Sequence, residues 1–296
     1  MRSNTKTPGL ARQKTLRKNK MNIHAIMNTT PDYAAIKVKQ NAAWGAGNYS
    51  KVGVTLQITG EELAETMDLN ADSKVLDVAA GNGNATLAFA RRFYDVTSTD
   101  YVQALLDASS KRAEAEGLSV NYQVADAENL PFEAQTFDAV ISTFGVMFTP
   151  NQKQSANELQ RVVRSGGKIG MANWTPESFI GQLFKTIGTH VTPPAGVNSP
   201  AFWGSREWVE ETFGAKCELR SFIRKNFMFR YRSAEHFTEY FRTFYGPMQK
   251  AFEALDADGQ AALQSDIVAL IEQFDISTDE TIRIPSEYAE IVLEMR

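Results

Sequence analysis

The stretch that decides the fold is Val75-Leu76-Asp77-Val78-Ala79-Ala80-Gly81-Asn82-Gly83-Asn84. Residues 74–78 form a short apolar run, which predicts a buried strand. The glycines and asparagines that follow predict a turn, and residues 84–94 have the pattern of a helix. A strand that enters a glycine-rich turn and then a helix is how α/β sheets bind nucleotides at the carboxyl ends of their strands.

Apolar runs and helical patterns alternate on both sides of this stretch. Strands are predicted at 74–78, 96–99, 120–124, 137–142 and 168–172, and helices at 54–68, 84–94, 102–116 and 154–164. This alternation predicts an α/β fold with a parallel, doubly wound sheet and right-handed crossovers. Residues 217–223 and 288–293 are expected to add two strands, for a mostly parallel seven-stranded sheet.

The pattern is less regular after residue 174. Residues 190–206 are rich in Pro, Gly and Ser and are expected to form a long functional loop. Residues 234–273 are helical in pattern and lie between the last two predicted strands. We therefore expect residues 31–296 to form a single domain in which 234–273 is a helical insertion.

Charge is unevenly distributed along the 296 residues. Residues 1–20 hold seven basic side chains and no acid, although the whole chain carries −4. The other 24 basic and 35 acidic residues give the body a charge of about −11, which argues against a nucleic-acid-binding protein. We expect residues 1–30 to be a basic, disordered tail, with a transit-like segment, an RNA-contacting arm or a start at Met21 as alternatives.

Composition also excludes several classes of protein. No stretch approaches the roughly 18 consecutive apolar residues that a membrane span needs. The single cysteine, Cys217, rules out an internal disulfide bond, and three scattered histidines do not suggest a metal centre. A cytoplasmic protein without a membrane span is therefore expected.

Asp77 distinguishes between the ligands that such a glycine turn binds. It lies inside the predicted strand, four residues before Gly81, and is expected to face the tail of the ligand. A carboxylate there would repel the pyrophosphate of a dinucleotide but suits a ligand with ammonium and sulfonium groups. S-Adenosylmethionine fits that description. Because nicotinamide-binding proteins share the glycine turn, an NAD-type Rossmann oxidoreductase remains an alternative.

Acidic residues also follow the next two predicted strands. Asp100, with Tyr101 after it, ends the second strand and is placed to accept hydrogen bonds from ribose hydroxyls. Asp126-Ala127-Glu128 follows the third strand, where a carboxylate accepts from an adenine amino group and the Ala127 N–H donates to the neighbouring ring nitrogen. Acids at the carboxyl ends of three successive strands together indicate a nucleoside site.

In these segments the sequence resembles the class I S-adenosylmethionine-dependent methyltransferases, of the type 11 group that includes the ubiquinone and menaquinone C-methyltransferases. The resemblance covers residues 54–175. It rests, in family order, on Val75–Asn84, Thr99-Asp100, Asp126–Phe132, Phe137–Val140 and Arg161–Gly167. It implies a Rossmann-like methyltransferase fold, S-adenosylmethionine as cofactor and S-adenosylhomocysteine as product, but it does not specify the acceptor.

The sequence departs from the family pattern at three places. Ala79 stands where the first glycine of the motif is usual, so a positive φ is not expected there. Ser165 replaces the proline that usually precedes two glycines. Ser142-Thr143-Phe144-Gly145 follows the fourth strand in place of an Asp/Asn-Pro-Pro-Tyr/Phe motif, which argues against methylation of DNA bases or glutamine and favours a small-molecule acceptor.

The acceptor is expected to bind beside the methionine moiety of the cofactor. Trp44–Tyr49 precedes the core and is expected to fold over that moiety, and the resemblance implies that the 234–273 insertion caps the active site. Five aromatic residues share one face of the first helix in this insertion: Phe237, Tyr240, Phe241, Phe244 and Tyr245. If they line a cavity rather than the core, the acceptor is apolar or aromatic. Arg242 lies off this face and is expected to pair with Glu239 or to hold an acceptor carboxylate.

Methyl transfer is an in-line displacement with a neutral thioether as leaving group, so no metal is expected to take part. The candidate catalytic residues are His236, Tyr245 and His190, of which the histidines titrate near neutral pH. The expected cofactor-binding residues are Tyr49, Asp77, Ala79, Gly81, Gly83, Asp100, Tyr101, Asp126, Ala127, Glu128, Thr143 and Phe144. The prediction is methyl transfer to carbon or oxygen of a small, apolar or aromatic molecule, with a non-catalytic S-adenosylmethionine-binding sensor as a further alternative.

Overall fold

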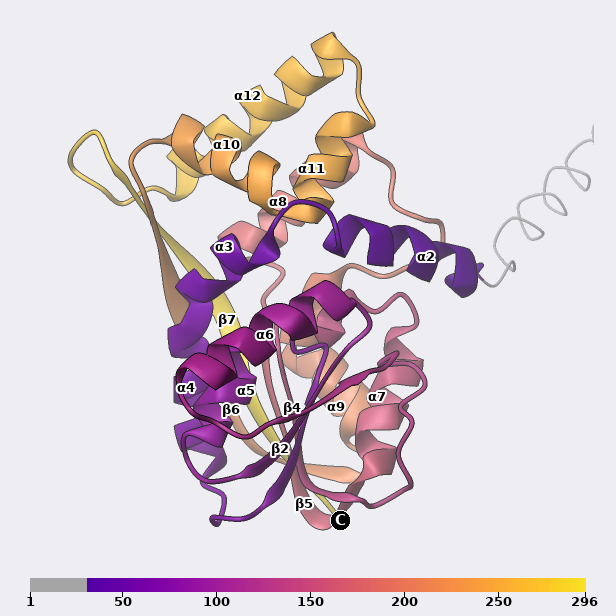
Figure 1. Cartoon of the computed structure of the whole chain (residues 1–296). Coiled ribbons are helices and arrows are strands. Elements are labelled where there is room, and N and C mark those ends of the chain that lie inside the picture. The colour runs from indigo at the N-terminus through magenta and orange to yellow at the C-terminus, as the bar shows by residue number, and fades with distance from the viewer. Residues whose placement is uncertain (1–30) are drawn as a thin grey trace, which may run out of the picture.

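The computed structural model describes residues 31–296, and the predicted tail at 1–30 lies outside the described residues. Seven strands form one sheet in the order β3-β2-β1-β4-β5-β7-β6 (Figure 1). The strands are β1 Lys74–Val78, β2 Asp95–Asp100, β3 Asn121–Val124, β4 Phe137–Thr143, β5 Val163–Trp174, β6 Cys217–Tyr231 and β7 Ile282–Met295. Only β7 runs antiparallel to its neighbours, which confirms the predicted mostly parallel, doubly wound α/β sheet.

Helices precede, connect and cap these strands. Their bounds are α2 Tyr33–Trp44, α3 Tyr49–Gly53, α4 Gln57–Met67, α5 Asn84–Ala90, α6 Gln103–Ala115, α7 Gln152–Val162, α8 Phe179–His190, α9 Arg206–Phe213, α10 Ala234–Phe244, α11 Gly246–Glu253 and α12 Ala257–Phe274. Short 3₁₀ turns lie at Val54–Leu56, Val146–Phe148 and Pro200–Gly204. The predicted long loop at 190–206 therefore contains a 3₁₀ turn and is flanked by two helices, α8 and α9, that the sequence pattern did not indicate.

The two faces of the sheet carry separate cores, because successive side chains of a strand point to opposite faces. Val75 packs with residues of α4 and α5 in the smaller core. Leu76, its neighbour, packs in the larger core, with residues of α7, α9 and the helices above the sheet. Both faces of the central strands are thus buried, which explains their continuous apolar runs.

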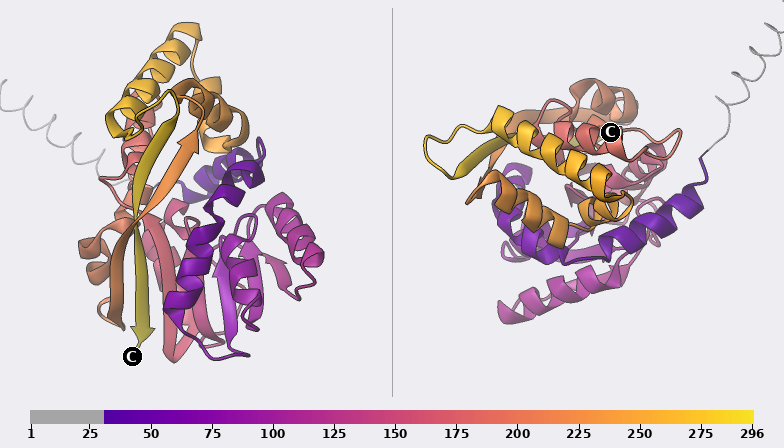
Figure 2. Two further views of the ribbon diagram at one scale, coloured as in Figure 1. Left: turned by 90° about the vertical axis from the view of Figure 1, so that its left-hand side faces the viewer. Right: turned by 90° about the horizontal axis from the view of Figure 1, so that it is seen from above.

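Strands β6 and β7 extend beyond the rest of the sheet. They pair with each other from Cys217 opposite Met295 to Tyr231 opposite Ile282, whereas the pairing of β5 with β7 ends at Trp174. Their upper parts form a two-stranded ribbon that carries α10, α11 and α12, which we call the cap (Figure 2). The cap lies at the carboxyl ends of the parallel strands, where the sequence analysis expected the ligands.

One face of α10 is buried, as its aromatic spacing predicts. Phe237 and Phe241 are buried and their rings stack with centroids 4.2 Å apart. Arg242 corrects an expectation, because it contacts neither Glu239 nor a cavity. Its guanidinium donates to Gln260 Oε1 at 2.8 Å and lies over the ring of Phe252.

The segment 33–56, which we call the lid, runs beside the cap and across the carboxyl ends of the strands (Figure 1). Its backbone meets the end of α10, where the Asn48 N–H donates to the Phe244 carbonyl and Gly47 forms an isolated bridge with Tyr245. The Tyr240 hydroxyl donates to the Lys51 carbonyl at 3.0 Å. Lid and cap are therefore joined by hydrogen bonds. No helix in the described part of the chain is long and apolar enough to cross a membrane.

Candidate functional site

The glycine-rich turn between β1 and α5 has three residues in the left-handed region. Gly81 and Gly83 have φ of 58° and 85°, and Ala79 has φ of 53°. The expectation that alanine removes the positive φ at position 79 is therefore wrong. The backbone of Gly145 lies close to Ala79, and a Cβ added at Gly145 would clash with the Ala79 carbonyl.

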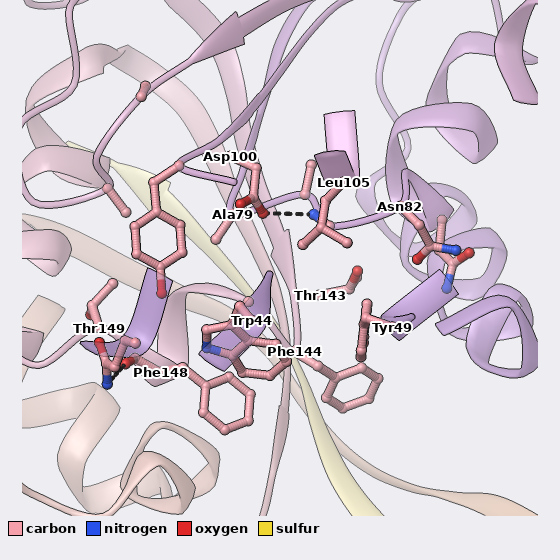
Figure 3. Close-up of a pocket in the computed structure, with 18 of the residues that line it drawn as sticks. Trp44, Tyr49, Ala79, Asn82, Asp100, Leu105, Thr143, Phe144, Phe148 and Thr149 are labelled. Carbon is pink, nitrogen blue, oxygen red and sulfur yellow. Dashed lines mark hydrogen bonds between the residues drawn. The ribbon is translucent and has the colours of Figure 1, made fainter. Parts of the chain in front are cut away.

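A cavity of about 860 Å³, counting the open space at its mouth, lies at the carboxyl ends of β1, β2 and β4 and beside the turn after β3 (Figure 3). It is the first cavity of the site. Nine of the predicted cofactor-binding residues line it: Tyr49, Ala79, Gly81, Asp100, Tyr101, Asp126, Ala127, Thr143 and Phe144. Residues from the connections that follow β1, β2, β3 and β4 and from the lid are thus gathered around one space, as expected at the carboxyl ends of a doubly wound sheet.

Asp100 joins the end of β2 to the glycine turn. Its Oδ2 accepts the Gly81 N–H at 2.9 Å (dashed in Figure 3), and its Oδ1 accepts the Val102 N–H at 2.8 Å. Burial raises the pKa of Asp100 to about 6, while the backbone N–H groups oppose that shift. Each carboxylate oxygen has a further lone pair, so the group remains able to accept from a ligand hydroxyl.

Asp77 lies behind the glycine turn and does not line the cavity. It is fully buried, with Oδ2 accepting from the Thr86 hydroxyl at 2.7 Å and Oδ1 without a partner among the described residues. Burial raises its pKa to about 7, against the effect of the Thr86 hydrogen bonds. Its side chain is hydrogen-bonded to Thr86 of α5, the helix that follows the turn, and does not face the first cavity.

Gly83 and Glu128 do not line the first cavity either. Gly83 caps α5, and a Cβ there would clash with the Ser109 hydroxyl. Glu128 accepts the Asn151 N–H at 2.7 Å and lies 3.1 Å from the ammonium of Lys37. Both therefore shape the loops of the site without contacting the cavity.

Helix α2 supplies residues that the sequence analysis missed. Lys37 pairs with Asp126 at 2.6 Å, and Asn41 and Gln40 donate to the Tyr101 and Phe148 carbonyls. No residue of α2 is buried, although Trp44 at its end packs against the larger core. The helix is fixed to the loops after β2, β3 and β4 by polar contacts that a sequence pattern does not reveal.

Asn82 is a further missed residue, although it lies within the decisive stretch. Its side chain lines the first cavity, only 2% of the residue is exposed, and its Nδ2 has no partner among the described residues. A buried amide donor without a partner is costly, so a ligand acceptor at this point would stabilise the site.

A second cavity of about 410 Å³ adjoins the first. It lies among the lid, α8, α10 and the ends of β5 and β6. Five residues line both cavities: Trp44, Tyr49, Leu56, Phe144 and Phe148. The remaining lining residues are Val52, Trp174, Ile180, Leu183, Phe184, Phe229, Phe241 and Tyr245. The two spaces therefore share an aromatic wall, part of which is labelled in Figure 3.

The three candidate catalytic residues are not brought together. Tyr245 lines the second cavity. His190, at the end of α8, lies 2.7 Å from Asp266 of α12, and His236 accepts the Arg232 N–H beside Tyr231. Neither histidine lines either cavity: His190 joins α8 to α12 of the cap, and His236 contacts the chain just before α10. Nor do the described residues include a cluster of three potential metal ligands.

Known proteins are similar to this chain in sequence. Residues 76–171 match the family model described as a methyltransferase domain. An uncharacterized protein of Mycobacterium tuberculosis is 35% identical over 254 residues, covering 84% of this chain and 93% of that protein. Demethylmenaquinone methyltransferase of Deinococcus radiodurans is 31% identical over 127 residues, covering 42% of this chain and 53% of the enzyme.

Solved structures show the same fold at low sequence identity. The YcgJ protein of Bacillus subtilis superposes with a TM-score of 0.56 at 18% identity, covering 80% of this chain and 98% of that one. A geranyl diphosphate methyltransferase in complex with S-adenosylmethionine superposes with a TM-score of 0.50 at 15% identity, covering 81% and 85%. The chain belongs to the class I S-adenosylmethionine-dependent methyltransferases and carries a methyltransferase domain of the type 11 group.

Proposed function

We propose that the protein binds S-adenosylmethionine in the first cavity and transfers its methyl group to carbon or oxygen of a small, apolar or aromatic acceptor in the second. The observation that carries this proposal is the shared wall: Tyr49 and Phe144 line both cavities, so ligands in the two spaces are neighbours. Residues 31–296 then act as a single catalytic domain, in which the cap covers the acceptor. Cytoplasmic location and the absence of a nucleic-acid partner belong to the same proposal.

The residues of the first cavity fit S-adenosylmethionine. The Asn82 amide offers an unpartnered donor for the methionine carboxylate, and Asp100 offers acceptors for the ribose hydroxyls. The ring of Tyr49 lies against Gly81, where a Cβ would be 3.4 Å from Tyr49 Cε1. When bound, S-adenosylmethionine supplies a methyl group on a positively charged sulfur, and aromatic faces such as that of Tyr49 tolerate this charge.

This chain's contribution to the reaction is to position two ligands and to exclude water. The lid and α10 cover the second cavity, and their backbone hydrogen bonds keep Trp44 and Tyr245 in contact, with ring centroids 5.4 Å apart. An acceptor bound there meets aromatic and aliphatic side chains, among which Tyr49 and Tyr245 carry hydroxyl groups. Exclusion of water protects the displacement from competing hydrolysis and strengthens electrostatic interactions within the site.

Calorimetric titration with S-adenosylmethionine, S-adenosylhomocysteine and NAD⁺ tests the cofactor. We expect the first two to bind and NAD⁺ not to bind. A mass-spectrometric screen of quinols, phenols and isoprenoids for products heavier by one CH₂ then tests turnover. S-Adenosylhomocysteine that forms only when an acceptor is present excludes a non-catalytic sensor.

The variant Asp100→Asn tests the assigned ribose site. Loss of a charged acceptor should weaken S-adenosylmethionine binding about ten- to hundredfold. Asp95→Asn, the same substitution at the exposed opposite end of β2, is the matched control and should leave affinity unchanged. Equal affinity in both variants would remove Asp100 from the cofactor site.

A further inference from the structure

No charged side chain lines the second cavity in the part of the chain that the structure describes. Its lining contains neither histidine, and the Asp266 partner of His190 lies on α12, away from the cavity. Asp100, on the far side of the shared wall, already accepts two backbone N–H groups. The cavity therefore offers an acceptor no carboxylate or imidazole to take up a proton.

Among residues 31–296, Tyr245 and Tyr49 are the two with hydroxyl groups in the lining of this cavity. Tyr245 is 8% exposed, and its hydroxyl hydrogen-bonds to none of the described residues. Burial raises the pKa of Tyr245 far above its usual range, and the nearby Tyr49 acts in the same direction. The pKa of Tyr49 is likewise raised, to about 12. Both phenols stay protonated near neutral pH, so they donate hydrogen bonds and do not act as bases.

The shape of the wall favours a flat ligand. Phe144 and Trp174 stack with centroids 4.1 Å apart and planes inclined by 15°. Phe148 and Tyr245 each contact Trp44 edge to face. Aromatic surfaces in such arrangements bind ring systems by stacking and edge contacts.

These features restrict the nucleophile. An alkene acceptor would leave a carbocation that must lose a proton, and an amine would leave an ammonium without a carboxylate to hold it. An un-ionised phenol would also need a base. An acceptor that is already deprotonated needs none, because its charge faces the positive sulfur and its oxygen can accept from Tyr245.

We propose that the acceptor is a flat, apolar molecule with an acidic enol or phenol, which binds as its anion with the oxygen hydrogen-bonded to the Tyr245 hydroxyl. The inference rests on the proposed function and specifies its substrate class. In the transfer step, the oxygen or the conjugated carbon of the anion forms a bond to the methyl carbon as the carbon–sulfur bond breaks. The bonding pair goes to sulfur, which becomes a neutral thioether, and the methylated product is neutral. No proton moves in this step.

Binding of two isomers tests this assignment without requiring turnover. 4-Hydroxycoumarin is a strongly acidic enol, and 7-hydroxycoumarin is a weaker phenol of the same size. At a pH between their pKa values only the first is an anion. With sinefungin bound, whose protonated amine replaces the sulfonium, we expect 4-hydroxycoumarin to bind at least tenfold more tightly than its isomer. With neutral S-adenosylhomocysteine bound instead, this preference should fall.

The variant Tyr245→Phe should weaken binding of the 4-hydroxycoumarin anion about tenfold while leaving sinefungin affinity unchanged. Tyr94→Phe is the matched control, because the Tyr94 hydroxyl donates to the Leu69 carbonyl on the other face of the sheet. The control should bind the anion as the unmodified protein does.

Equal binding of the two isomers, no binding of the anion, or an unchanged anion affinity in Tyr245→Phe would each overturn the inference. The proposed function fails on different evidence, namely if S-adenosylmethionine does not bind or no acceptor is methylated. If the protein methylates weakly acidic or neutral acceptors, and the rate follows the titration of an enzyme group, the acidic enol or phenol is rejected as the acceptor class. The proposed methyltransferase function would still stand.

Discussion

Asp77 is a buried acid whose ionisation opposes folding. Its pKa is raised from 3.8 to about 7 by burial, so its contribution to stability is fully present below 3.8 and is lost as pH rises through about 7. If Asp77 dominates the pH dependence of stability, the ligand-free protein should therefore be less stable at about pH 8 than at about pH 5. Urea unfolding at both pH values measures the difference.

Asp77→Asn should remove much of that difference, because an amide keeps the Thr86 hydrogen bond and cannot ionise. At about pH 8 the variant should be more stable than the unmodified protein by about 2–4 kcal/mol, at about 1.4 kcal/mol for each unit of pKa shift. If the variant keeps the full pH dependence, Asp100, whose pKa is also raised, or another group is responsible.

The site residues that the sequence predicts correctly are those next to a local pattern, such as the end of a predicted strand. Asp100 and Asp126 follow apolar runs, and the ends of parallel strands converge at one edge of a sheet. Lys37 meets the site through its contact with Asp126, which lies 89 residues further along the chain, and no local pattern encodes such a contact. The positive φ of Ala79 occurs where Gly145, from the end of a different strand, lies close to its carbonyl, and a local pattern does not reveal that approach.

At the scale of the elements, alanine substitutions at two glycines with positive φ distinguish the cost of backbone strain from the cost of a steric clash. Gly117, after α6, has φ of 68° and nothing within 4 Å of an added Cβ, so Gly117→Ala should cost about 1–2 kcal/mol. Gly83 caps the start of α5 and has φ of 85°, and a Cβ added there also clashes with Ser109 of α6. Gly83→Ala should cost about 2 kcal/mol more. If chemical denaturation shows equal losses in the free energy of unfolding for the two variants, α6 shifts to accommodate the added methyl group.

Replacement of His190 on α8 or His236 on α10 should leave both ligand sites intact. His190→Ala breaks the contact between α8 and α12, and His236→Ala removes the acceptor for the Arg232 N–H. We expect each to lower stability by about 1 kcal/mol. Sinefungin and acceptor affinities, measured by calorimetry, should stay within twofold of the unmodified protein. A selective loss of turnover in either variant would instead return that histidine to a catalytic role.

The elements that sequence predicted well are the buried ones. Strands β1, β4 and the core of β5 are covered on both faces and read as apolar runs. The upper part of β6 is at the edge of the ribbon, and its exposed Arg224 and Arg230 interrupt any such run. Helix α8 contains Gly181 and Gly188, which lower helix propensity, so its formation depends on tertiary packing.

For the whole molecule, ligand binding should appear as thermal stabilisation. S-Adenosylmethionine at about one hundred times its Kd should add about 2.7 kcal/mol to the free energy of unfolding, or about 4–5 °C in Tm for a chain of this size. Adenosine, which lacks the methionine moiety expected near Asn82, should give a smaller shift at the same concentration. Differential scanning calorimetry measures both. An equal shift with adenosine would mean that the glycine turn does not contact the methionine moiety.

The cap leaves the sheet at Tyr231 and returns at Ile282, and these two residues are paired neighbours in the ribbon. Everything between them can therefore be lengthened, shortened or replaced without changing the strand order of the sheet. For a lineage of such enzymes, this junction permits new caps to be recombined onto an unchanged methyl-donor domain. Acceptor preference can then diversify by exchange of a single continuous gene segment, while the chemistry of methyl transfer is inherited intact.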